Sequence, residues 1–234
     1  MRKYAWLFLS IGLTFSLVGC GDSGSSGGGG SGGSASTATV SGTVYNAVLD
    51  GEPTELVGAT VAVVGGQSTT SVAGGAFSLD APVGTVMFLT TAPNAWGELL
   101  TAEVPAGGED MAEAEVVPDA LVAEIATALD KTIDPAKGMV IVEFDAEVAV
   151  GGETADLGSS YGFAFVFRAN GDVEIGNQLE AGDDAQVLFA NVDVTSDVMP
   201  SAGMGGGSCT LEFPSTTFPS EAKVFTIVDV APCP

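Results

Sequence analysis

The feature that most constrains this chain is a succession of short β-type runs that begins at Thr39. Each run is rich in Val, Thr, Ala and Phe, and glycine, proline or asparagine separates it from the next. In the first half the runs cover residues 40–45, 59–64, 69–72, 76–79, 85–91 and 99–104. In the second half they cover residues 138–144, 162–167, 173–175, 185–194, 208–213 and 222–230. Short strands at this spacing are typical of antiparallel sandwiches, so the chain is predicted to be all-β.

Two turns in this pattern predict β-hairpins. Gly74-Gly75 lies between the runs 69–72 and 76–79, and Asn170-Gly171 precedes the run 173–175. Hairpin turns of two residues require positive φ angles, which glycine adopts without steric cost.

The alternation after the first turn predicts which side chains are buried. Phe77 and Leu79 flank Ser78, and alternate residues of a strand point to opposite faces of a sheet. We therefore expect Phe77 and Leu79 to lie in the core with Val61 and Val63, and Ser78 to face solvent.

The residues of this first half also follow a known family pattern. Glycine, small and apolar residues stand at the places of that pattern: Gly42, Val44, Gly58, Ala59, Val61, Thr70, Gly75, Phe77, Pro82 and Gly84. Residues 39–116 thereby resemble the carboxypeptidase regulatory-like domain, a small transthyretin-like β-sandwich of exported bacterial proteins. Val57 replaces the usual proline before the strand glycine, and Ala73 departs from the usual acidic or asparagine residue before the hairpin glycine. The resemblance implies a transthyretin- or immunoglobulin-like sandwich without catalytic activity of its own.

Residues 117–136 interrupt the β pattern. Pro118 suits a first helical turn, and Leu121, Ile125 and Leu129 recur at a spacing of four residues. This segment is predicted to be a short helical linker between the first sandwich and a second one at residues 137–234. The alternative is that the helix belongs to a single larger domain.

The amino-terminal residues indicate where the protein is located. Arg2 and Lys3 precede an almost wholly apolar run, and Leu17-Val18-Gly19 leads into Cys20. Residues 1–19 resemble a bacterial lipoprotein signal peptide, which implies cleavage before Cys20 and acylation of that cysteine with palmitate or similar chains. An uncleaved anchor would need about 20 apolar residues, and ordinary secretory cleavage would expect an A-x-A-like site. The resemblance implies a lipid-anchored protein of the cell envelope, expected at the outer membrane.

Residues 20–38 contain the lipidated cysteine and a Gly/Ser-rich linker. Such a tract cannot bury a core and acts as a flexible tether, here with a reach of about 24 Å. We expect it to hold the folded part away from the membrane surface.

Charge and cysteine content restrict the partners. The formal net charge is −24, and without residues 1–19 only four Lys or Arg remain against 30 Asp or Glu, which gives −26. A surface this acidic repels nucleic acid, so we expect none as a partner. Cys209 and Cys233 remain as an even pair in an exported chain and are predicted to form a disulfide; two free thiols are the alternative.

The residue types exclude several kinds of catalysis. The sequence contains no histidine, which removes Ser-His-Asp and Cys-His catalysis and histidine-based metal sites. The metallocarboxypeptidase H-x-x-E element is likewise absent. We therefore expect no enzymatic activity and no cofactor.

Two weaker candidate sites remain. Glu180, Asp183 and Asp184 surround Gly182 and are the best calcium ligands of the chain, with a plain acidic loop as the alternative. Trp96 lies between Pro93 and Gly97, where it is either a binding-surface aromatic or a cap on the core.

The expected function is that of a non-enzymatic, membrane-anchored envelope lipoprotein that displays β-sandwich modules with a structural or adhesive role. The alternative is a surface lipoprotein that binds carbohydrate or peptide. The expected partners are the membrane, through the lipid anchor, and an envelope glycan or protein.

Overall fold

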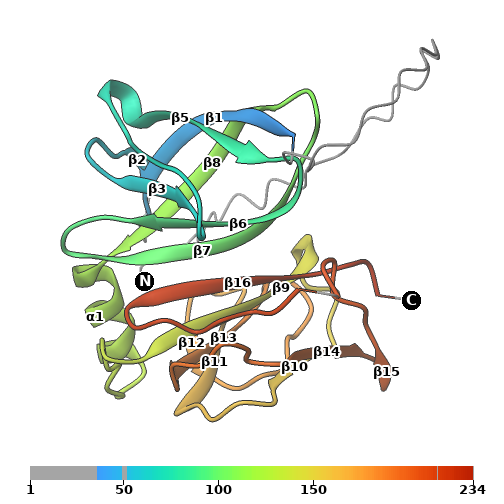
Figure 1. Ribbon diagram of the computed structural model, residues 1–234. Helices are drawn as coiled ribbons and strands as arrows, with labels where there is room; N and C mark the ends of the chain where they lie inside the picture. Colours follow the sequence, from blue (N-terminus) through green and yellow to red (C-terminus); the bar gives the residue numbers. More distant parts are fainter. Residues whose placement is uncertain (1–35, 49–51, 215, 234) are drawn as a thin grey trace, which may run out of the picture.

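The computed structural model describes residues 36–48, 52–214 and 216–233. Two sets of strands lie one above the other, with a single described helix beside them (Figure 1). The prediction of an all-β chain is confirmed. Within the described ranges, no helix is both long and apolar enough to cross a membrane.

The first set of strands, residues 37–118, forms two facing layers. Its elements are β1 (Thr37–Asn46), β2 (Thr54–Glu55), β3 (Thr60–Val63), β4 (Ser68–Thr70), the 3-10 turn η1 (Ala73–Gly75), β5 (Ala76–Pro82), β6 (Gly84–Thr91), β7 (Ala95–Val104) and β8 (Glu109–Pro118). One layer has β1 between β5 and β8, and the other has the order β4-β3-β6-β7. The two layers enclose a core of Val, Ala, Leu and Phe side chains.

Strand β5 shows the expected alternation. Phe77 and Leu79 are buried and Ser78 is exposed, and the buried pair shares one core with Val61 and Val63. The sequence prediction for these residues is confirmed. It succeeded because one face of β5 meets the core and the other meets solvent.

The Gly74-Gly75 turn does not join a hairpin, so that prediction is wrong. Strand β4 before the turn pairs with β3, whereas β5 after it pairs with β1 in the other layer. Both glycines do have positive φ angles, of 73° and 67°. A Cβ at Gly75 would lie 2.5 Å from the carbonyl oxygen of Val44, so the turn passes too close to β1 for another residue. The glycines therefore allow the chain to cross between layers.

The helix α1 (Asp119–Ala128) lies within the predicted linker and is shorter than it. It ends where Asp130 adopts a left-handed conformation with a φ of 51°, a common way for a helix to stop. Leu121, Val122 and Ile125 are buried in a core that also contains Trp96 of β7. This middle core includes residues from both sets of strands, so α1 packs against both.

The second set of strands lies in residues 138–230. Its elements are β9 (Gly138–Val148), β10 (Glu153–Leu157), β11 (Phe163–Phe167), β12 (Val173–Ile175), β13 (Asp184–Val192), β14 (Pro200–Met204), β15 (Gly207–Ser208) and β16 (Val224–Val230). One sheet has the order β12-β11-β13-β9-β16, and a small sheet has the order β10-β14-β15. Phe167 pairs with Val173 across the Asn170-Gly171 turn, so that predicted hairpin is confirmed.

Strand β16 joins the two sets of strands into one continuous sheet. It is parallel to β9 on one side and parallel to β7 on the other, where Val224, Phe225 and Thr226 face Gly97, Glu98 and Leu99. We call this β7–β16 contact the seam. Strands β1 and β8 are also parallel, so the sheet is mixed where an antiparallel one was expected. The predicted division into sandwiches at 39–116 and 137–234 stays a prediction, because β16 belongs to the second range but pairs with a strand of each.

Candidate functional site

Cys20, the predicted lipidation site, lies outside the described residues. Its signal peptide and Gly/Ser linker do so as well, apart from the last few linker residues. The remaining predicted site residues are all described, and they lie in three separate places.

Trp96 is the second residue of β7, and its side chain is only 3% exposed. Its ring packs edge-on against Phe225, with ring centroids 5.6 Å apart. A buried ring offers no surface on which a sugar or peptide could stack, so Trp96 does not have the position of a binding-surface aromatic. The position matches the alternative, a tryptophan that caps the core.

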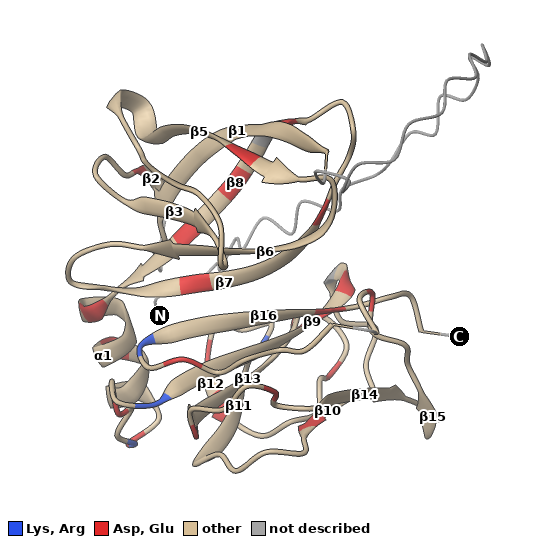
Figure 2. Ribbon diagram, viewed as in Figure 1, with Lys and Arg blue, Asp and Glu red and all other residues tan. Residues whose placement is uncertain are grey.

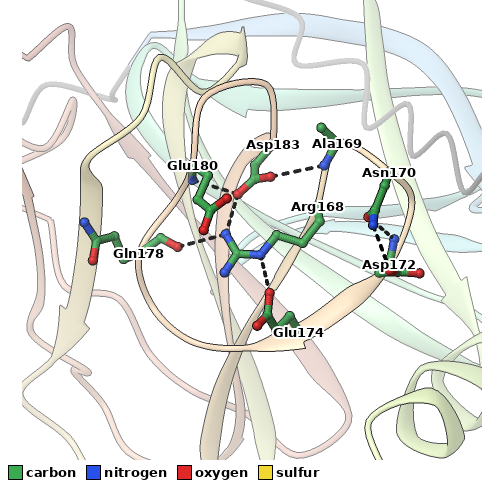
Figure 3. Close-up of polar contacts among 8 residues, drawn as sticks. All are labelled: Arg168, Ala169, Asn170, Asp172, Glu174, Gln178, Glu180 and Asp183. Carbon is green, nitrogen blue, oxygen red and sulfur yellow. Dashed lines mark hydrogen bonds and ion pairs between the residues drawn. The ribbon is translucent and has the colours of Figure 1, made fainter.

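The acidic loop at residues 180–184 is organised around Arg168 (Figure 3). Arg168 Nη1 donates to Asp183 Oδ2 at 2.6 Å, and Arg168 Nε donates to Glu174 Oε2 at 2.6 Å. The backbone N–H groups of Ala169 and Glu180 donate to the Asp183 carboxylate at 3.1 and 2.7 Å. Asp183 is 2% exposed, so this is a buried carboxylate whose charge a guanidinium neutralises.

These contacts give the calcium prediction no support. Both oxygens of Asp183 already accept hydrogen bonds, and the positive charge beside them is that of Arg168. Asp184 has a buried Oδ2 without a hydrogen-bond partner, and burial, with a smaller effect of Asp183, raises its pKa to about 6. Among the described residues, no group of three or more His, Cys, Asp or Glu is arranged to hold a metal ion. Calcium at Glu180, Asp183 and Asp184 remains an untested prediction.

The predicted disulfide between Cys209 and Cys233 is present, with the two Cα atoms 4.8 Å apart. Cys209 follows β15 and Cys233 follows β16. Both side chains pack against the second core, beside Leu211 and Phe213. The bond therefore attaches the end of the shared strand β16 to the second set of strands.

The structure also gathers four carboxylates that the sequence did not single out. Asp229 of β16 faces Glu143 of β9 in register, and Glu98 of β7 faces Phe225 of β16. Residues 96, 98 and 100 share a face of β7, and Trp96 and Leu100 of that face contact the middle core. By the same alternation Glu143 shares a face with Ile141, and Asp229 with Ile227, both in that core. The carboxylates therefore continue the apolar face of the middle core.

Glu115 of β8 completes this group, and we call Glu98, Glu115, Glu143 and Asp229 the seam carboxylates. The backbone N–H of Glu115 donates to Glu98 Oε2 at 2.9 Å, which fastens β8 to β7 beyond their two paired residues. All four side chains are partly buried. Strands β7, β8, β9 and β16 each supply one of them.

Burial is the main reason that Glu98, Glu115 and Asp229 bind protons tightly. It raises the pKa of Glu98 to about 7, against the lowering effect of the Glu115 N–H, and Glu143 and Asp229 raise it further. Burial and the charges of Glu98, Glu113 and Glu143 raise the pKa of Glu115 to about 8. Burial, Glu143 and Glu212 raise the pKa of Asp229 to about 7. These three carboxyls can therefore exchange protons near neutral pH.

The sequence did contain a signal for the seam carboxylates. Glu143 stands in Met139-Val-Ile-Val-Glu-Phe144 and Asp229 in Val224-Phe-Thr-Ile-Val-Asp-Val230, so each is a single acid inside an apolar run. An acid in such a run marks a half-buried charge, which is rarely placed there without a partner. Which partners would meet could not be read from the sequence, because the four strands come from distant segments.

Comparison with known proteins yields no family. No family model matches the chain, and no curated protein matches it either. Among solved structures, the Bacillus anthracis TIE protein is similar at 11% identity and a TM-score of 0.28, over 83% of this chain and 34% of that one. The shaft pilin SpaA from Lactobacillus rhamnosus GG gives 12% identity and a TM-score of 0.25, over 85% of this chain and 98% of the pilin.

A Streptococcal ancillary pilin gives 12% identity and a TM-score of 0.23, over 85% of this chain and 63% of that one. This chain thus spans about a third of the length of the TIE protein. TM-scores this low do not establish a shared fold, so the function has to be argued from the residues of the chain.

Proposed function

We propose that this protein is a lipid-anchored, non-enzymatic structural or adhesive module of a bacterial cell envelope. The observation that carries the proposal is the sequence Leu17-Val18-Gly19-Cys20, which follows a positive start and a short apolar run. Each buried acyl CH2 group contributes about 0.8 kcal/mol, so the two or three chains of a lipidated cysteine hold a protein to a membrane durably.

Features outside the signal support the same proposal. The Gly/Ser tract after Cys20 suits a tether, and the Cys209–Cys233 disulfide suits an oxidising compartment outside the cytosol. The first set of strands, in which Phe77 and Leu79 of β5 are buried, is compatible with a carboxypeptidase regulatory-like domain at residues 39–116. We propose the outer membrane as the location of the anchor.

A binding role is the less supported alternative. Trp96 was its candidate residue, and the ring is buried against Phe225. An adhesive role would have to use other surfaces, and the acidic surface disfavours nucleic acid as a partner. Figure 2 shows Asp and Glu over both sets of strands, whereas the Lys and Arg of the described residues lie near the second.

The anchor is tested by replacing Cys20 with Ala in the full chain, expressed in a bacterial host that processes lipoproteins. The wild-type protein is expected in the membrane fraction with an acylated amino-terminal Cys20, measured by intact mass. Cys20→Ala is expected to be released from the membrane or left with its signal attached. Ser23→Ala, three residues further on, is the control and is expected to behave like the wild type. A mature amino terminus other than acylated Cys20 would refute the proposed anchor.

A further inference from the structure

The seam is a narrow junction between two larger bodies. Only Val224, Phe225 and Thr226 of β16 pair with β7. The middle core and α1 lie beside this pairing, and the seam carboxylates continue the same face of the sheet. The strength with which the two sets of strands hold together therefore depends on that face.

The groups that surround the seam carboxylates are mostly acids as well. The charge of Glu113 on β8 raises the pKa of Glu115, and the charge of Glu212 raises the pKa of Asp229. The backbone N–H of Glu212 also donates to the Asp229 carbonyl. Tyr45 of β1 faces Glu115 in register, and Asp145 follows Glu143 on the same face of β9. Gln186 of β13 faces Glu143 from the other side.

Three of the four described Lys and Arg residues form ion pairs elsewhere. Lys137 pairs with Asp193, Lys223 with Asp119, and Arg168 with Asp183 and Glu174. Lys131 follows α1. Among the described residues, none of these four appears among the groups that shift the pKa of Glu98, Glu115 or Asp229.

A second observation points to protons as the neutralising species. Gln186 is 6% exposed, and its buried Oε1 has no hydrogen-bond partner. Gln186 is directly opposite Glu143 in register, and such residues have Cβ atoms about 5 Å apart, so this oxygen lies beside the acidic group. A carboxylate can only accept hydrogen bonds and would leave that oxygen unsatisfied. The described acids also offer no group arranged for a metal ion.

We propose that the seam carboxylates form a pH-sensitive latch that holds the two sets of strands together while it is protonated and loosens when it loses its protons. In the protonated state Glu98, Glu115 and Asp229 are neutral and can donate hydrogen bonds within the seam. In the deprotonated state like charges from β7, β8, β9 and β16 repel one another across it.

The sign of the effect follows from the raised pKa values. In an unfolded chain Glu98, Glu115 and Asp229 have ordinary pKa values of 4.5 for Glu and 3.8 for Asp, whereas in the folded chain their pKa values are about 7 to 8. Below the ordinary pKa values these carboxyls are protonated in both states, and the stability that the latch contributes is fully present. As the pH rises, the folded state binds more protons than the unfolded one, so stability falls, and the loss is complete above about pH 8.

Trp96 is a built-in reporter of the latch. The chain has two tryptophans, Trp6 and Trp96; because Trp6 lies in the proposed signal peptide, Trp6→Phe makes Trp96 the single tryptophan whether or not that segment has been removed. Trp96 is buried in the middle core, where it contacts Phe225 of the paired segment of β16. Its fluorescence is measured in the full chain carrying Trp6→Phe, from pH 5 to pH 9, with far-UV circular dichroism on the same samples.

We expect the emission to move toward that of a solvent-exposed indole as the pH rises from 5 to above 8, while the β-type circular dichroism persists. The triple variant E98Q/E115Q/D229N keeps the size of the protonated groups, and its emission is expected to stay at the low-pH value up to pH 9. D229N alone is expected to move the midpoint to higher pH, which keeps the test open if the triple variant does not fold. Glu103→Gln is the control, because it removes one negative charge from β7, as the Glu98 replacement does, but at an exposed position. It is expected to titrate like the wild type.

Three results would overturn the latch. The first is emission that does not change between pH 5 and pH 9. The second is a D229N or triple variant that titrates like Glu103→Gln. The third is the loss of the wild-type transition when Ca²⁺ is added to about 5 mM, roughly a saturating concentration for weak extracellular calcium sites. A metal ion would then neutralise the carboxylates in place of protons.

Discussion

At the scale of single residues, Asp183 and Glu174 bind the same guanidinium from different environments. Asp183 is 2% exposed and Glu174 is 61% exposed, although both accept a hydrogen bond of 2.6 Å from Arg168. Removing one partner of a buried pair leaves an uncompensated charge, whereas an exposed pair is screened by water. The two carboxylates therefore form a matched pair for mutation.

We expect Asp183→Ala to lower the free energy of unfolding by about 3–5 kcal/mol, because Arg168 and two backbone N–H groups lose their partner. Glu174→Ala is the control and is expected to cost about 1 kcal/mol or less. Urea denaturation followed by circular dichroism measures both. Equal losses for the two variants would mean that Asp183 is not the buried partner of Arg168.

The core of the first set of strands gives a second test at this scale. Phe77 packs against Val61 and Leu79, so Phe77→Ala leaves a cavity and is expected to cost about 3–5 kcal/mol. Ser78 is exposed on the same strand, and Ser78→Ala is expected to change stability by no more than about 0.5 kcal/mol. Chemical denaturation of the full chain distinguishes the two. A similar cost at both positions would contradict the register of β5.

At the scale of elements, a hairpin predicted from the sequence was correct where neighbouring residues alone specify the strand pairing. The Asn170-Gly171 hairpin was predicted correctly, because a short turn and the alternation on either side of it specify the pairing of β11 with β12. The Gly74-Gly75 turn has the same glycine signal, yet β4 and β5 belong to different layers. A turn specifies a change of direction, but the neighbouring strands decide which partner the next strand meets.

The disulfide is the second feature at this scale. Cys209 and Cys233 enclose all of β16, the strand shared by the two sets. We expect the double replacement Cys209→Ser/Cys233→Ser to lower the free energy of unfolding by about 2–5 kcal/mol, because the unfolded chain regains freedom. Thermal and urea denaturation measure the loss, and reduction of the wild-type protein should match it. Free thiols in freshly isolated protein would instead show that the bond does not form.

At the scale of the whole molecule, β16 couples two sets of strands that the sequence suggested were separate. Because β16 pairs with both β7 and β9, neither set can unfold without disrupting the strand that the other uses. We therefore expect one cooperative unfolding transition at pH 5, where the latch is protonated. Circular dichroism and the fluorescence of Trp96, in the chain carrying Trp6→Phe, should give coincident curves. Two separated transitions would favour independent sandwiches at 39–116 and 137–234.

The sequence by itself determined the features that depend on local order. These are the all-β class, the burial of Phe77 beside an exposed Ser78, the position of α1, and the disulfide between Cys209 and Cys233. Each follows from a periodicity of two or four residues, a turn or a residue count, and none requires knowledge of which distant segments meet.

The tertiary structure alone decided which distant strands are neighbours. It placed Phe225 beside Glu98, turned Trp96 into the middle core, and gave Asp183 an arginine partner. A parallel pair such as β7–β16 has no connecting turn that could reveal it in the sequence. The seam carboxylates meet for the same reason. Their strands are brought together by burial of the apolar residues beside them, and that shared burial is a property of the whole molecule.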